Sequence, residues 1–261
     1  MRRGRRAAKD IRHVSTRSEL KLVRALQQKK YREQEKLFLV QGRKVVNELL
    51  KSGWKIEAIH ATAELAQQIH HPAVRQLPAH ELDRLGTLES GNEVIAVVRL
   101  PDRSMPIQLK QDELVIALDS INDPGNLGTI LRIADWFGID HVICSAGSVD
   151  AFNPKCVQAS MGAIFRVSVH YVDLPVELDR LKKNGASIHL ASMEGGSVFD
   201  RKLERPSILV LGSESHGISE EVRAIGGTAI SIPGADRSES LNVATAAAAL
   251  CMEFDRQWRA R

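Results

Sequence analysis

Strands and helices alternate along the second half of the chain, and this alternation limits the possible folds more than any other feature. Apolar stretches such as ELVIALDSI (113–121) and SILVLG (207–212) are rich in β-branched and aliphatic residues. Between them lie helix-like stretches such as LPVELDRLKKNG (174–185), which ends at a glycine. Strands that are almost continuously apolar and alternate with helices form a mostly parallel sheet covered on both faces. We therefore expect an α/β domain over residues 113–261.

A shorter alternation precedes this domain. The stretch LFLVQG (37–42) predicts a strand and RKVVNELLKSG (43–53) a helix, and EVIAVVRL (93–100) predicts a buried strand. The stretch PDRSMPIQLKQD has two prolines, several charges and no periodicity, which is typical of a linker. The predicted order is a basic flexible tail (1–15), a smaller α/β domain (16–100), a linker (101–112) and the larger domain (113–261).

Positive charge is concentrated near the N-terminus. Residues 1–50 carry 15 Lys and Arg against 5 Asp and Glu, although the whole chain has a net charge of only +4. This asymmetry indicates contact with a polyanion, and a solvated tail is the alternative. The capping-box pattern Thr16-x-x-Glu19, with Leu20, Val23 and Leu26 at helical spacing, predicts an ordered basic helix. Such a helix favours a nucleic acid as the partner.

Several function classes find no support in the sequence. No apolar run approaches the roughly 20 residues that span a bilayer, and the basic start lacks the apolar core of a secretory signal. Cys144, Cys156 and Cys251 lack metal-site spacing and are typical of buried residues in a reducing compartment. Dinucleotide, P-loop and nucleophile-elbow motifs are absent. We expect a cytoplasmic protein without a metal or a membrane contact; an organellar transit peptide at the N-terminus is the alternative.

Three loops that follow predicted strands are dense in small and polar residues. Ligands of parallel sheets bind beyond the carboxyl ends of the strands, so these loops are the candidate site. In the first loop Asn126 is expected to cap a helix, and Arg132 follows six residues later. In the second, Glu214 is expected to accept hydrogen bonds from backbone amides, and in the third Ser240 and Asn242 open an alanine-rich helix. Capping, a plain turn and tight helix packing are the structural alternatives, and the residues alone predict a loop-built pocket without a reaction.

Taken together, the three loops resemble a known family. In order, NDPGNLGTILRIADWFGI (122–139), LVLGSESHGIS (209–219) and ISIPGADRSESLNVATAAAAL (230–250) are similar to motifs 1, 2 and 3 of the TrmH/SpoU-type (SPOUT superfamily) RNA 2′-O-ribose methyltransferases. QASMGAIFRVSV (158–169) is similar to a fourth stretch of that family. The resemblance covers about residues 113–258, and the upstream unit looks like the family's substrate-binding domain, which resembles RNA-binding ribosomal proteins.

The resemblance implies a fold, a reaction and partners. It implies a deep trefoil knot that binds S-adenosylmethionine (AdoMet), a homodimer with the site at the knotted interface, and methyl transfer to a ribose 2′-hydroxyl. Ribosomal RNA is favoured as the substrate, because modules that resemble ribosomal proteins recognise folded RNA. The alternatives are a tRNA 2′-O-methyltransferase, a non-catalytic RNA-binding or ribosome-assembly factor with the same fold, and a small-molecule α/β enzyme with an incidental basic tail.

The resemblance also implies roles for single residues. Five would form the catalytic set and five others would bind AdoMet through backbone and apolar contacts, with no metal. The implied catalytic residues are Arg132, Asn126, Glu214, Ser240 and Asn242, and the implied cofactor-binding residues are Ala191, Leu211, Gly212, Ile232 and Leu241.

Overall fold

The protein is described by a computed structural model that covers residues 15–88, 91–102, 109–235 and 240–259. Of the predicted basic tail, residues 1–14 therefore lie outside the described residues. The chain forms two compact units, the first comprising residues 1–47 and 53–100 and the second comprising residues 48–52 and 101–261.

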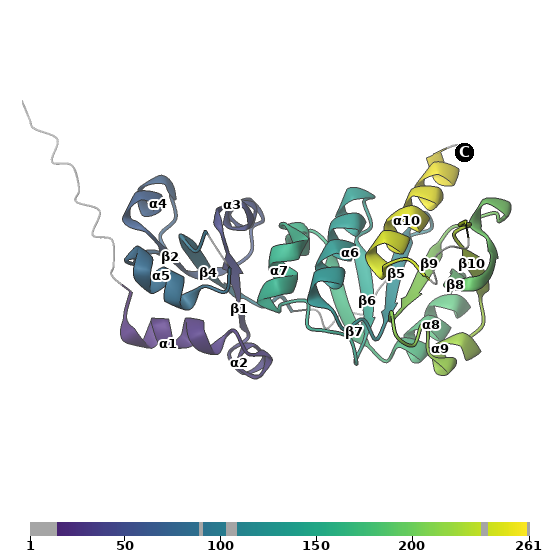
Figure 1. Cartoon of the computed structure of the whole chain (residues 1–261), viewed down its shortest axis with the longest axis horizontal. Helices are drawn as coiled ribbons and strands as arrows, with labels where there is room; N and C mark the ends of the chain where they lie inside the picture. Colours follow the sequence, from purple (N-terminus) through teal and green to yellow (C-terminus); the bar gives the residue numbers. More distant parts are fainter. Residues whose placement is uncertain (1–14, 89–90, 103–108, 236–239, 260–261) are drawn as a thin grey trace, which may run out of the picture. The chain divides into compact units, whose positions relative to one another are not determined.

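The described residues from 15 to 100 build a four-stranded sheet with helices around it (Figure 1). The sheet order is β1-β4-β2-β3, in which β4 is antiparallel to both β1 and β2, and β3 is parallel to β2. The elements are α1 (Arg17–Ala25), α2 (Lys29–Glu35), β1 (Leu37–Gln41), α3 (Arg43–Lys51), β2 (Ile56–Ala61), α4 (Ala63–Gln68), β3 (Val74–Gln76), α5 (Ala79–Leu85) and β4 (Val94–Arg99).

The helix α1 begins where the sequence predicts. Thr16 is its N-cap, and the side chains of Thr16 and Glu19 form the reciprocal bonds of a capping box. Val23 and Leu26 are fully buried in the core of this unit. Arg32 on α2 is also buried, and its guanidinium donates to the backbone oxygens of Leu26 and Gln27 at 2.9 and 2.8 Å. This arginine therefore stabilises the end of α1 and is not part of the exposed basic surface.

The second unit contains a six-stranded sheet in which every neighbouring pair is parallel, as the sequence predicts. The strand order is β10-β8-β9-β5-β6-β7. The elements are β5 (Leu114–Asp119), α6 (Pro124–Trp136), β6 (His141–Ser145), α7 (Pro154–Ser160), η1 (Ala163–Phe165), β7 (Ser168–Val172), α8 (Leu174–Lys183), β8 (Ser187–Ser197), η2 (Val198–Asp200), β9 (Ser207–Gly212), α9 (Glu220–Ala224), β10 (Thr228–Ser231) and α10 (Val243–Arg259).

Helices cover both faces of this sheet (Figure 1). On one face, apolar residues of α8 and α9 such as Leu178 and Val222 pack on Val115 and Val210 of the strands. On the other face, α6 packs against both α7 and α10. The contact of α6 with α7 requires a glycine, because a Cβ atom at Gly128 would lie 2.6 Å from the backbone oxygen of Cys156. The central strands are thus sealed from water, and only their ends reach the surface.

Within the described residues, no helix combines the length and the apolar character that crossing a membrane requires. The three cysteines Cys144, Cys156 and Cys251 are buried, and none forms a disulfide bond in the described part of the chain.

The core beneath α10 contains a buried histidine. His189 on β8 is 4% exposed, and its ring meets that of Phe254 on α10 edge-on at a centroid distance of 5.3 Å. Neither ring nitrogen has a hydrogen-bond partner in the described part of the chain. Burial lowers the pKa of His189 to about 4, and the charge of Glu204 offsets this only in part. Folded His189 is therefore neutral at neutral pH.

This histidine makes the fold sensitive to acid. The unfolded chain protonates the imidazole with a pKa near 6.5, whereas the folded chain resists protonation until about pH 4. The unfolding free energy therefore falls as the pH drops from about 6.5 to 4, by about 2 kcal/mol at pH 5 relative to pH 7.5. We expect His189→Leu to remove this part of the decline in urea titrations at the two pH values. His70→Leu, which removes an exposed imidazole, should leave the decline unchanged; equal declines in both variants would contradict this assignment.

Candidate active site

A cavity of about 1110 Å³ opens at the carboxyl ends of β8, β9 and β10. Pockets of this order of size hold cofactors and other small molecules. The five residues to which the sequence assigns cofactor binding all line it: Ala191 lies on β8, Leu211 and Gly212 end β9, Ile232 follows β10, and Leu241 precedes α10. Glu214 and Ser240 of the implied catalytic set line it as well. Three segments that are distant in the sequence thus contribute to one hollow.

The loop after β9 is a tight turn that closes on itself. Ser213 and Gly217 exchange backbone hydrogen bonds in both directions, at 3.1 and 2.9 Å. A Cβ atom at Gly212 would lie 2.1 Å from the carbonyl carbon of Gly217, so only glycine permits this closure. The turn presents Glu214 at the edge of the cavity.

The loop is also anchored to the neighbouring strand. Asp119, the last residue of β5, is 4% exposed, and its carboxylate accepts the backbone amide of Ser219 at 2.8 Å. The sequence reasoning missed this residue, although a carboxylate at the end of a buried strand was a signal that could have found it. Asp119 joins β5 to the loop after β9, so it helps to position Glu214.

Hydrogen bonds between side chains connect the three loops. The amide nitrogen of Asn126 donates to the Glu214 carboxylate, and the amide nitrogen of Asn242 donates to the Asn126 oxygen at 3.1 Å. The oxygen of Asn242 in turn accepts the backbone amides of Ala244 and Thr245 at the start of α10, at 3.0 and 3.3 Å. Three of the five implied catalytic residues therefore form one chain of contacts across three motifs.

Two local expectations about these residues are wrong. Asp123 and not Asn126 caps α6, because its carboxylate accepts the backbone amide of Asn126 at 2.9 Å and Pro124 occupies the first helical turn. The hydrogen bond of Lys155, and then the amide of Asn126, lower the pKa of Asp123. In the described part of the chain Glu214 accepts the Asn126 side chain and no backbone amide. Since Asp123 supplies the cap, the Asn126 side chain is free to reach Glu214.

The other two residues of the implied set lie apart from this chain of contacts. Ser240 is exposed and lines the cavity. Arg132 is exposed on α6 and has no hydrogen bond or ion pair with any residue that the structure describes. Because successive helical residues are about 100° apart, six residues place Arg132 about 120° around the axis from Asn126. Within one chain, Arg132 therefore projects from a different side of α6 than Asn126 does.

Among the residues that the structure describes, the site contains no evident place for a metal ion. In residues 15–88, 91–102, 109–235 and 240–259, no group of three or more His, Cys, Asp or Glu side chains could hold one. What the arrangement offers is a hollow with backbone and apolar walls, a carboxylate and two amides at its edge, and a free guanidinium on a neighbouring helix face.

Comparison with known proteins identifies these features. Residues 113–252 match the model of the SpoU rRNA Methylase family, and residues 17–99 match the MRM3-like substrate binding domain. The chain is 30% identical to the 23S rRNA (guanosine(2553)-2′-O)-methyltransferase RlmP of Bacillus subtilis, over 86% of this chain and 91% of that protein. It is 29% identical to the 23S rRNA (uridine(2479)-2′-O)-methyltransferase of Streptomyces viridochromogenes, over 84% of this chain and 83% of that protein.

Solved structures give the same result. The SpoU methyltransferase AviRb of Streptomyces viridochromogenes, in complex with AdoMet, superposes with a TM-score of 0.82 and 27% identity over 93% of this chain and 98% of that one. An AdoMet-bound rRNA methyltransferase of Sinorhizobium meliloti superposes with a TM-score of 0.83 and 27% identity over 94% and 97% of the two chains. The family predicted from the three loops is thus confirmed: this chain belongs to the SpoU rRNA methylase family.

Proposed function

We propose that this protein transfers the methyl group of AdoMet to a ribose 2′-hydroxyl of ribosomal RNA. The observation that carries the proposal is the chain of contacts from Glu214 through Asn126 to Asn242, at the edge of a cofactor-sized cavity. Ribosomal RNA is favoured over tRNA because the relatives just described are named for 23S rRNA and the N-terminal unit matches a substrate-binding domain.

The cavity suits AdoMet. Leu211, Ile230 and Leu250 give it apolar walls, which fit an adenine ring, and Glu214 and Ser240 give it a polar edge. Ala191, Leu211, Gly212, Ile232 and Leu241 would hold the cofactor through backbone and apolar contacts. When bound, AdoMet supplies an electrophilic methyl group on a sulfonium. The role of the protein is then to place a hydroxyl in line with that methyl group and to exclude water.

A knotted C-terminal segment accounts for how α10 is held. The chain leaves β10 beside β8, and α10 then packs against α6 and also contacts β9 and η2. The segment that links η2 to β9 bonds to the end of this helix: Trp258 donates to the Leu203 oxygen at 3.0 Å, and Arg205 donates to the Trp258 oxygen at 2.7 Å. Such contacts support a deep trefoil knot, in which an earlier loop encloses the last helix.

The placement of Arg132 supports a homodimer. Within one chain, the Arg132 guanidinium projects about 120° away from Asn126 around α6. Arg132 therefore cannot lie on the same helix face as the chain of contacts from Glu214 through Asn126 to Asn242. Helices α6 and α10 pack together, and each exposes a large apolar side chain, Trp136 at 84% and Met252 at 63%. Contiguous exposed apolar patches mark protein interfaces, and these two side chains lie on helices that pack together. We assign this surface to a second copy, whose Arg132 completes the site.

Arg132 then acts on the RNA as a cation and not as a base. Arginine side chains stay protonated in proteins, and their planar fork matches the oxygens of a phosphate. Held beside the reacting ribose, the guanidinium would grip the adjacent phosphate and lower the pKa of the 2′-hydroxyl electrostatically. The same phosphate can accept the proton as the methyl group transfers. Asn126, Glu214, Ser240 and Asn242 would hold the edge of the site at which this ribose lies.

The N-terminal unit offers a basic face to the RNA. Arg17, Lys21 and Arg24 follow one another at helical spacing on α1, and all three are exposed. Val23 and Leu26 on the other side of the helix are buried, so the basic face is held on a rigid support. The cytoplasm is our proposed location, because three buried cysteines that form no disulfide bond among the described residues suit a reducing compartment.

The reaction itself can be read from alkali-treated RNA. The protein is incubated with labelled AdoMet and unmodified ribosomal RNA, and the product is hydrolysed in alkali. A 2′-O-methyl group removes the nucleophile that cleaves the neighbouring phosphodiester, so the label should appear in alkali-resistant dinucleotides. Label in mononucleotides would indicate base methylation instead. Absence of label, with RNA binding intact, would support a non-catalytic assembly factor, and greater label in tRNA would overturn the choice of rRNA.

Mixed dimers test whether Arg132 serves the partner's site. Arg132→Ala and Asn242→Asp should each reduce turnover by about 100-fold or more, since each disables both sites of its own dimer. After equal mixing and reassembly, half of the dimers carry both chains, and one of their two sites combines Asn242 with the partner's Arg132. We therefore expect recovery to about one quarter of the natural activity. If Arg132 served its own chain, no site would be intact and the mixture would remain inactive.

The basic face of α1 can be neutralised without removing buried residues. We expect the triple variant Arg17→Gln, Lys21→Gln, Arg24→Gln to bind RNA more weakly at low salt, with a salt-dependence slope smaller by about 2 to 3. AdoMet affinity measured by calorimetry should not change. Matched replacement of Arg180, Lys183 and Lys202 by Gln, at the second unit's surface, controls for the loss of three charges. Equal effects of the two triple variants would refute a specific role of α1.

A further inference from the structure

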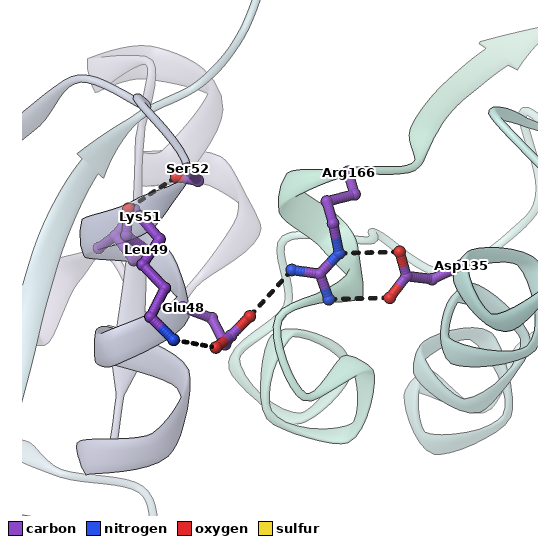
Figure 2. A network of polar contacts seen from close by, with 6 residues as sticks. All are labelled: Glu48, Leu49, Lys51, Ser52, Asp135 and Arg166. Carbon is purple, nitrogen blue, oxygen red and sulfur yellow. Dashed lines mark hydrogen bonds and ion pairs between the residues drawn. The ribbon is translucent and has the colours of Figure 1, made fainter. Parts of the chain in front are cut away.

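An arginine outside the proposed site holds a carboxylate on the same helix as Arg132. Arg166 follows η1, and its planar fork faces the carboxylate of Asp135 near the end of α6 (Figure 2). Nε donates to one carboxylate oxygen and Nη2 to the other, both at 2.8 Å. Both oxygens of Asp135 thus receive a charge-assisted hydrogen bond from a single partner.

The Arg166–Asp135 ion pair contributes little to the stability of the folded chain. The side chain of Arg166 is 47% exposed and that of Asp135 is 27% exposed, so water and salt screen their attraction. Exposed ion pairs of this kind contribute little to folding. The parallel geometry, in contrast, fixes where the Asp135 carboxylate points.

Asp135 lies one helical turn beyond Arg132. Residues three apart on a helix are neighbours on its surface, about 60° apart around the axis, and their Cβ atoms are about 5–6 Å apart. An aspartate at this distance can form an ion pair with the arginine that precedes it. In the described structure it does not: the Asp135 carboxylate binds Arg166, and Arg132 stays exposed without a described partner.

We propose that Arg166 is a positioning residue that keeps Arg132 available to the RNA by holding the carboxylate of Asp135. This proposal rests on the proposed function, in which Arg132 grips the phosphate beside the reacting ribose. If Arg166 did not hold it, the carboxylate would compete with the phosphate for Arg132. It would also repel the phosphate directly, because both groups are negative.

Three variants distinguish this positioning role from a purely structural role of the Arg166–Asp135 ion pair. We expect Arg166→Gln to lower kcat/KM for RNA by roughly three- to tenfold, since a freed carboxylate both pairs with Arg132 and repels the phosphate. AdoMet affinity and the thermal midpoint should change little. Asp135→Asn, which removes the competing charge, should keep kcat/KM within about twofold of the natural chain. The double variant Arg166→Gln, Asp135→Asn should return to that same level.

The rescue is the decisive result. If the pair only braced the fold, Asp135→Asn would be as damaging as Arg166→Gln, and the double variant would be no better than either; that outcome overturns the proposal. An unrescued double variant with an active Asp135→Asn would show that Arg166 acts through another contact, either its ion pair with Glu48 at 3.0 Å (Figure 2) or the RNA itself, which also overturns it. In an Arg132→Ala background, Arg166→Gln should lower kcat/KM by a smaller factor than in the natural chain, because only the repulsion of the phosphate remains. An equal loss in both backgrounds would contradict the proposal. Full activity of Arg132→Ala alone would instead refute the proposed function, so the two failures are distinguishable.

Discussion

The chain of side-chain contacts from Glu214 through Asn126 to Asn242 is the interaction on which the site depends. It joins the start of α6, the loop after β9 and the start of α10, which are separated by as many as 116 positions in the sequence. All three segments lie at the carboxyl edge of one parallel sheet, where backbone amides at helix starts are unpaired and polar side chains can satisfy them. These bonds connect the three small-residue loops to one another at the edge of the cavity.

Several residues in this region serve two purposes at once. Asn242 caps α10 with its oxygen and bonds Asn126 with its nitrogen, so the last helix is both begun and positioned by one amide. Asp123 takes over the capping of α6 and leaves Asn126 for the site. The Asp119 carboxylate connects the end of β5 to the loop after β9 through a hydrogen bond. Each of these contacts is a hydrogen bond between neighbouring segments. Together they fix the positions of the side chains at the carboxyl edge of the sheet.

The charged residues also divide into ones that hold the structure and ones that stay exposed. The Asp135 carboxylate is held by Arg166, while Arg132 on the same helix stays exposed. In the N-terminal unit, Arg32 is buried as a support for α1, whereas Arg17, Lys21 and Arg24 face solvent. Basic residues that look equivalent in a charge count therefore divide into structural ones and ones that can meet a polyanion. That division depends on helix phase and burial, which a charge count does not contain.

Sequence patterns predicted most of the longer elements of the fold but not the short β3, α5, α7 and β7. The apolar stretches, the glycine-ended helices and the capping box at Thr16 and Glu19 are local features, and the parallel sheet with helices on both faces follows from their alternation. The hydrogen-bond partners of Asn126 and Glu214 were not predictable, because each residue equally suits a helix cap or a turn when only its neighbours in sequence are considered. Asp119 was missed for the same reason.

The sequence by itself thus determined where most of the longer strands and helices form, since periodicity and capping act over a few residues. The tertiary structure alone decided which loops meet, because the order β10-β8-β9-β5-β6-β7 brings together segments whose separation along the chain gives no hint of it. It also decided that Asn126 bonds to Glu214 and Asn242, whereas Arg132 has no partner among the described residues. Contacts between distant segments depend on strand order and helix rotation, and these are set by the packing of the whole domain.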